Sequence, residues 1–174
     1  MDSKAFGDLY DAHVRQVYRY HYYRTQHRET AEDLTSLTFT KALGRIGTFD
    51  PERGTFLAWI YRIARNALVD HYRAAREAVD IDDVWDLKSD ADVQKDAETR
   101  ERIEKLRPYL QALPKDQREI LLLRLWDDLP YADIAAITGR SEAACKMAFS
   151  RTVSRLRKDV PASILLLLLF IRLL

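Results

Sequence analysis

The apolar positions near the N-terminus recur at helical spacing. Between residues 4 and 25 an aromatic or large apolar side chain returns every three or four positions, which predicts a helix over this segment. Its apolar face comprises Phe6, Tyr10, Val14, Val17, Tyr18, His21 and Tyr22, with Tyr20 and Tyr23 on the flank. The tyrosines at 18, 20 and 22 alone are typical of a strand, but the longer window favours a helix.

Two further helices are predicted in this half of the chain. The first spans residues 30–46, where acidic side chains near the start are favourable at the positive end of the helix dipole. Residues 47–54 contain two glycines and a proline and are therefore expected to form a loop. The second helix spans 55–76 and has its apolar side at Phe56, Trp59, Ile60, Ile63 and Ala67. The arginines on its other side, taken alone, are more often a solvated face than a binding surface.

Helical periodicity disappears between residues 77 and 98. This segment carries nine acidic and two basic side chains, whereas the flanking blocks carry 12 basic against nine acidic and 14 against nine. Composition favours a flexible acidic linker between two modules that each approach a polyanion. Its isolated apolar side chains leave open that part of it docks on another surface.

The C-terminal half contains a second series of helices. A pattern over 99–112 is broken by Leu113-Pro114, and a helix over 115–127 follows. Pro130 opens a short helix that Gly139 ends in a left-handed conformation, and Ser141 is the N-cap of a last helix over 142–159. We therefore predict an all-α protein with two small helical domains, 1–76 and 99–160, the linker 77–98, and a hydrophobic tail at 161–174.

Residues 131–158 have the spacing of a helix-turn-helix. Ile134 and Ile137 would face the core together with Cys145, Phe149, Thr152 and Leu156. An ordinary corner between two helices gives the same spacing. If the segment binds DNA, base edges and phosphates would be contacted by the N-cap and the outward residues of the second helix. These are Ser141, Glu142, Lys146, Met147, Ser150, Arg151 and Arg155, with Arg157 and Lys158 on phosphates.

Two separate blocks resemble the extracytoplasmic-function sigma factors of bacteria, a group within the sigma-70 family. The segment LPKDQREILLLRLWDDLPYADIAAITGRSEAACKMAFSRTVSRLRK resembles region 4 of that family. AEDLTSLTFTKAL (31–43) and FDPERGTFLAWIYRIARNALVDHYR (49–73) resemble region 2. The blocks occur in the family's order and spacing over about 85% of the chain.

The resemblance implies roles for individual residues. Asp33, Leu34 and Leu37 would bind the β′ clamp of core RNA polymerase, with Phe39 in the core, and region 4 would meet the β flap. The surface for the melted minus-ten element would comprise Arg53, Arg62, Arg65, Asn66, Asp70 and Arg73. Trp59 is expected to fill the core rather than stack on a base. The acidic linker would thread polymerase channels that hold nucleic acid.

Several positions depart from the family pattern. Leu37 replaces the usual glutamate, and Pro130 replaces the usual serine. Met147 and Ala148 stand where the family has a polar residue and often an arginine near the minus-thirty-five element, so the preferred promoter sequence cannot be carried over.

The remaining chemistry argues against an enzyme. The single Cys145 excludes an intramolecular disulfide and a cysteine-built zinc site, and no nucleophile–base motif, metal spacing, cofactor motif or small-molecule substrate site is indicated. The N-terminus lacks the pattern of a secretory signal, which favours a cytoplasmic protein. The tail 164–174 would span only ~16 Å as a helix, against a hydrocarbon core of ~30 Å. It therefore packs on the chain itself, docks on a partner, or touches a membrane surface.

The sequence thus predicts an alternative sigma factor that directs promoter-specific initiation and is regulated by an anti-sigma factor. One alternative is a self-sufficient helix-turn-helix regulator that binds duplex DNA as a dimer. Another is an adaptor tethered to a membrane by its leucine tail.

Overall fold

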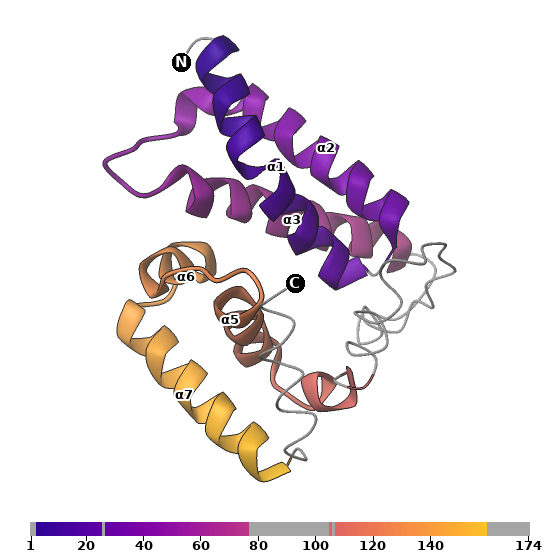
Figure 1. The fold of residues 1–174 in the computed structure, drawn as a ribbon, viewed down its shortest axis with the longest axis vertical. Coiled ribbons are helices and arrows are strands. Elements are labelled where there is room, and N and C mark those ends of the chain that lie inside the picture. The colour runs from indigo at the N-terminus through magenta and orange to yellow at the C-terminus, as the bar shows by residue number, and fades with distance from the viewer. Residues whose placement is uncertain (1–2, 26, 77–104, 106, 160–174) are drawn as a thin grey trace. The chain divides into compact units, whose positions relative to one another are not determined.

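The chain forms two compact helical units, Met1–Ala91 and Asp92–Leu174. The computed structural model describes residues 3–25, 27–76, 105 and 107–159, and every regular element within them is a helix (Figure 1). The predicted all-α fold is confirmed. The acidic linker 77–98 and the tail 161–174 lie outside the described residues, as does the whole segment 99–104 that was expected to begin the fourth predicted helix.

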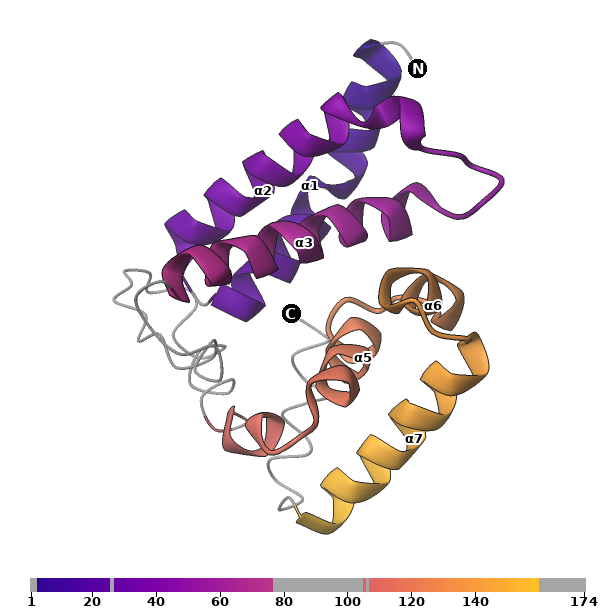
Figure 2. The same cartoon turned by 180° about the vertical axis from the view of Figure 1, so that it is seen from behind.

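The first unit is built from three helices. α1 (Ser3–Thr25) packs on both α2 (Arg28–Gly44) and α3 (Phe56–Arg76), and α2 also packs on α3 (Figures 1 and 2). A short 3-10 turn, η1 (Ile46–Thr48), and a loop connect α2 to α3. α2 therefore ends two residues before the predicted position 46, because the chain tightens into the 3-10 turn.

The position of α1 between two neighbours changes which of its faces is buried. Tyr20 and Tyr23 are only 1% and 6% exposed, whereas Tyr10 is 41% exposed. The prediction that Tyr20 and Tyr23 lie on the flank was wrong. A single apolar stripe describes a helix with one neighbour, but α1 contacts two helices and therefore buries a wider strip.

Polar side chains tie α1 to its neighbours inside this unit. The Tyr72 hydroxyl donates to the carbonyl of Arg24 over 2.8 Å, and the Tyr61 hydroxyl donates to the carbonyl of Gln16 over 3.4 Å. The His21 Nε2 and Thr38 Oγ1 atoms lie 3.1 Å apart, and the Thr38 hydroxyl donates a hydrogen bond to the carbonyl of Leu34. Because Thr38 has only one proton, Nε2 of a neutral His21 must be the donor in this pair.

Side-chain caps begin two of these helices. The Nδ1 atom of His27 accepts from the backbone N–H of Thr30 over 3.2 Å at the start of α2. The Thr55 hydroxyl accepts from the backbone N–H of Ala58 over 3.0 Å, so Thr55 caps α3 instead of forming its first residue.

The second unit contains helical residues 107–111, α5 (Lys115–Leu125), α6 (Tyr131–Thr138) and α7 (Glu142–Asp159). α5 packs on both α6 and α7, which also pack on each other. α5 ends before the predicted residue 127, since the chain turns away through Asp128, whose φ is 51°. Trp126 and Leu129 close the core beyond its end, at 1% exposure each. No helix among the described residues is long and apolar enough to cross a membrane.

Candidate nucleic-acid interface

The turn between α6 and α7 has the predicted local chemistry. Gly139 ends α6 with a φ of 71°, a left-handed conformation that costs glycine little. The Ser141 hydroxyl accepts from the backbone N–H of Ala144 over 3.2 Å and so caps α7. Both local predictions are confirmed, and together they set the direction in which α7 leaves the turn.

The inner faces of the two helices are also those predicted from the sequence. Ile134, Ile137, Cys145, Thr152 and Leu156 are all buried. Phe149 is half-buried, and its ring meets the Tyr131 ring edge-on at 6.0 Å. With this register fixed, the opposite side of α7 faces outward.

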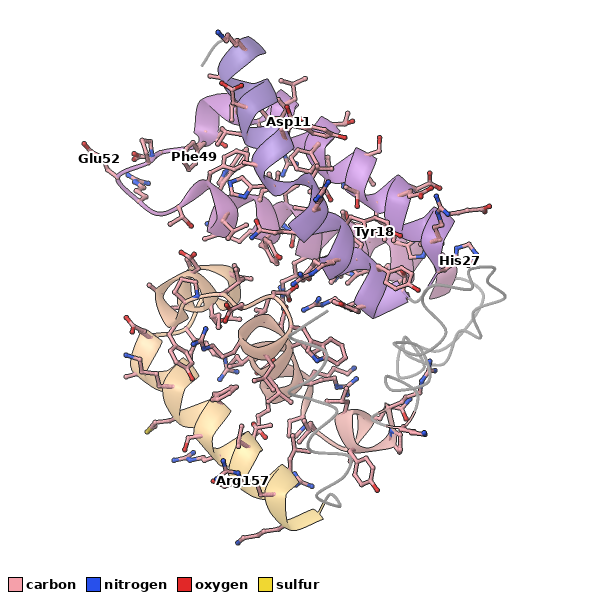
Figure 3. All side chains as sticks on the ribbon, in the orientation of Figure 1. Asp11, Tyr18, His27, Phe49, Glu52 and Arg157 are labelled. Atoms are coloured by element: carbon pink, nitrogen blue, oxygen red, sulfur yellow. The ribbon has the colours of Figure 1, made fainter. Side chains whose placement is uncertain are left out.

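The outward side of α7 and its N-cap collect the residues that the sequence singled out for DNA contact. Every one of them is exposed. They are Ser141, Glu142, Lys146, Met147, Ser150, Arg151 and Arg155. The Lys146 Nζ atom lies 2.6 Å from Glu142 Oε1 and 5.7 Å from the centre of the Tyr131 ring. Arg157, labelled in Figure 3, extends the basic character toward the end of α7.

Two contacts around this surface were not predicted. The Arg140 guanidinium, within the turn, pairs with Asp116 at the start of α5. The Tyr131 ring has the Arg124 guanidinium 5.4 Å from its centre, besides Lys146. Arg140 and Tyr131 are not part of the apolar periodicity that predicts the buried face. The signals that could have found these contacts are a basic residue inside the turn and an aromatic residue at the first position of a helix.

The first unit carries a second polar surface, along α3. Arg62, Asn66 and Arg73 are exposed at helical spacing, so they share one side of α3. Arg65, also predicted for this surface, is half-buried on its flank. Asp70 is exposed and pairs with Lys41 of α2 over 3.4 Å. The predicted residues of α3 thus lie along one helix, with the acidic side chain of Asp70 already paired.

The loop before α3 projects away from the helices. Figure 3 shows Glu52 at its tip. Arg53 Nε and Asp50 Oδ2 lie 3.2 Å apart there, and the Arg53 side chain is 87% exposed. Behind the tip, the Phe49 ring packs against Phe56 at 5.5 Å and Trp59 at 5.6 Å. Trp59 is half-buried within this aromatic cluster, which supports a packing role rather than base stacking.

The α2 residues predicted to contact polymerase differ in their exposure. Asp33 and Leu37 are exposed, but Leu34 is only 4% exposed and packs inside the unit. Its side chain is therefore buried in the chain without a partner, and its contact with polymerase stays a prediction. Phe39 is a core residue, as expected, at 4% exposure. Its ring meets Tyr10 at 4.7 Å.

Within the described part of the chain, no group of three or more His, Cys, Asp or Glu side chains is placed to hold a metal ion. Exposed hydrogen-bond donors and cations instead lie together on α3 of the first unit and on α7 of the second. Cations and donors of this kind bind phosphates and base edges.

Comparison with known proteins identifies the same two units. The family model "Sigma-70 region 2" matches residues 9–78, and "Sigma-70, region 4" matches residues 103–156. The chain is 36% identical over 170 residues to the ECF RNA polymerase sigma factor BldN of Streptomyces coelicolor, covering 92% of this chain but only 62% of that longer protein. It is 32% identical over 152 residues to the ECF RNA polymerase sigma factor SigM of Bacillus subtilis, covering 86% of this chain and 91% of the relative.

A solved structure shares the fold of this chain. It is the co-crystal structure of the sigma factor RpoE of Bartonella quintana in complex with the anti-sigma factor NepR. The TM-score is 0.68 and the identity 25%, with 89% of this chain and 96% of that chain covered.

Proposed function

Because this chain belongs to the extracytoplasmic-function sigma factors of the sigma-70 family, we propose that it binds core RNA polymerase and directs promoter-specific initiation by contacting the promoter at two places. The observation that carries this proposal is the exposed polar face of α7 behind a correctly formed glycine turn. The catalysis belongs to the polymerase, and the chain itself acts in the cytoplasm as a specificity subunit without a cofactor.

The second unit binds the minus-thirty-five element through α7. An α-helix fits the major groove, where the four base pairs present different donors and acceptors. The N-terminal residues of the second helix of such a motif reach the base edges, which assigns Glu142, Lys146 and Ser150 to readout. Arg151 and Arg155 follow on the same helix and bind phosphates, which adds affinity without sequence information.

The first unit holds the melted minus-ten element. Unstacking a base costs a few kcal/mol, so a melting surface needs compensating contacts to the single strand. The stripe of Arg62, Asn66 and Arg73 on α3 and the exposed Arg53 of the preceding loop supply such contacts. The Phe49–Phe56–Trp59 cluster supports them by anchoring the loop to α3.

Partner proteins are assigned to the remaining surfaces. Asp33 and Leu37 on the exposed side of α2 would meet the β′ clamp of the polymerase, and the second unit would meet the β flap. An anti-sigma factor would hold the chain inactive. The complex of the related RpoE with NepR supports this part of the proposal.

Transcription with purified components tests the proposal. The full chain is added to core polymerase and a library of genomic templates, and transcript starts are mapped. Transcript starts should lie downstream of a shared pair of promoter elements, and no such starts should appear without the chain. Binding of the chain alone to specific duplex DNA, with no promoter-specific starts on adding polymerase, would instead identify a self-sufficient regulator.

A further inference from the structure

The outward face of α7 carries one long apolar side chain. Met147 is 55% exposed, and among the described residues of the second unit it is the only large apolar side chain exposed to this extent. A single exposed apolar side chain on a protein surface needs no explanation by itself. Met147 differs because of its position, which is the centre of the surface assigned to DNA.

Its direction follows from the buried residues of the same helix. Met147 lies two residues after Cys145, which is fully buried. At ~100° of rotation per residue, the two side chains point to nearly opposite sides of α7. Met147 therefore points away from the core, toward the side of α7 on which the DNA would lie.

Its neighbours leave the thioether free to reach outward. Ala143 stands one turn before Met147 and Ser150 one turn after it, and both are exposed. These side chains are short, so the Met147 side chain extends beyond them. A methionine side chain is unbranched and flexible, and it adapts to an irregular apolar surface.

The charges around Met147 fit a nucleic acid rather than an apolar protein surface. Lys146 pairs with Glu142 on one side, and the exposed Arg151 lies one turn further along the helix. Within the major groove, the apolar group that the bases present is the C5 methyl of thymine. Guanine and cytosine edges suit Lys146 and Glu142 instead.

Building on the assignment of α7 to the major groove, we propose that Met147 contacts the C5 methyl of a thymine and so selects a T·A pair within the minus-thirty-five element. This contact makes Met147 a specificity-determining residue. It acts at a position where the family pattern does not predict the base.

Deoxyuridine substitution isolates this contact, because uracil keeps the O4 acceptor of thymine and lacks only the methyl group. The full chain bound to core polymerase selects its preferred duplex from a pool with a randomised upstream segment. Each thymine of that duplex is then replaced singly by deoxyuridine. One replacement should weaken binding by the wild-type chain about fourfold, as expected for one methyl group removed from an apolar contact.

Two variants make the test specific. Met147→Gln keeps the length of the side chain but removes its apolar end, so the same replacement should change its affinity by less than about twofold. Leu43→Gln is the matched control, since Leu43 is equally exposed at 55% but lies on α2 of the first unit. Its ratio of thymine to deoxyuridine affinity should equal the wild-type ratio.

The outcomes are distinguishable. A preferred segment without thymine, or equal deoxyuridine sensitivity of wild type and Met147→Gln, would overturn the role of Met147 while leaving the groove assignment intact. The absence of any preferred segment in the selection would contradict the proposed function itself.

Discussion

At the scale of single residues, His21 links the packing of the first unit to pH. The side chain is fully buried, and its Nδ1 atom has no hydrogen-bond partner among the described residues. Burial, reinforced by the charges of Arg24 and His71, lowers the pKa of His21 from 6.5 to about 3. A proton on Nδ1 would therefore be a buried charge without an acceptor.

This geometry predicts a loss of stability on acidification. Between pH 6.5 and 3 the unfolded chain binds a proton at His21 that the folded chain does not, so stability falls as the pH falls. From pH 6.5 to 5 the loss should be about 1–2 kcal/mol in the free energy of unfolding. Urea titrations at several pH values measure it. The His21→Gln variant should show a flatter dependence, and an unchanged slope would count against this role.

Lys146 offers the most direct test of the proposed contact between α7 and promoter DNA. Lys146→Ala should weaken binding of the chain–polymerase complex to its promoter by about tenfold, as expected for a lost base contact. Affinity for core polymerase should stay unchanged. Lys105→Ala removes the same charge from an exposed position outside α7 and serves as control. An equal loss in both binding assays for Lys146→Ala would argue that the substitution disturbs the unit as a whole.

At the scale of elements, the glycine turn determines how α6 and α7 meet. A Cβ at Gly139 would meet no heavy atom within 4 Å, so a substitution there costs only backbone strain. Gly139→Ala should destabilise this unit by about 1–2 kcal/mol, because the residue must hold a left-handed φ. Gly139→Asn should cost less, since asparagine tolerates that region. Faster amide exchange in α6 and α7 reports the effect, and identical exchange in Gly139→Ala and wild type would exclude it.

The α3 stripe should act in promoter opening. Asn66→Ala is expected to slow formation of the open complex, since an exposed amide donor and acceptor is removed from the surface proposed for the single strand. Binding of duplex DNA carrying only the minus-thirty-five element should be unaffected. The amide control is Gln111→Ala, exposed in the other unit. Normal opening kinetics with Asn66→Ala would remove this residue from the melting surface.

Local signals explain which elements could be predicted from the sequence. The turn at Gly139, the cap at Ser141 and the inner residues of α7 follow from single-residue preferences and one periodicity, and all three are present. The burial of Tyr20 and Leu34 could not be assigned in the same way. It depends on α1 having two neighbours and on the rotation of α2, which only the tertiary packing determines.

The features of the candidate site likewise divide into those set by local sequence signals and those set by tertiary packing. Which side of α7 faces outward follows from the buried stripe. The contacts of Tyr131 with Lys146 and Arg124, and the pairing of Arg140 with Asp116, join residues from three helices and a turn. Such contacts have no sequence period, so they emerge only when the helices are placed.

At the scale of the whole molecule, the two surfaces belong to separate units and should fail separately. The second unit recognises duplex DNA and the first unit acts in melting, so a change that bypasses one step should not compensate for a defect in the other. A template whose minus-ten segment is already unpaired bypasses only the melting step of the first unit.

The most direct measurement is initiation by the chain with core polymerase on fully duplex and premelted versions of one promoter. The account predicts that premelting restores Asn66→Ala to the wild-type rate and leaves the defect of Lys146→Ala in place. Rescue of both variants, or of neither, would contradict a division of promoter recognition between α7 and α3.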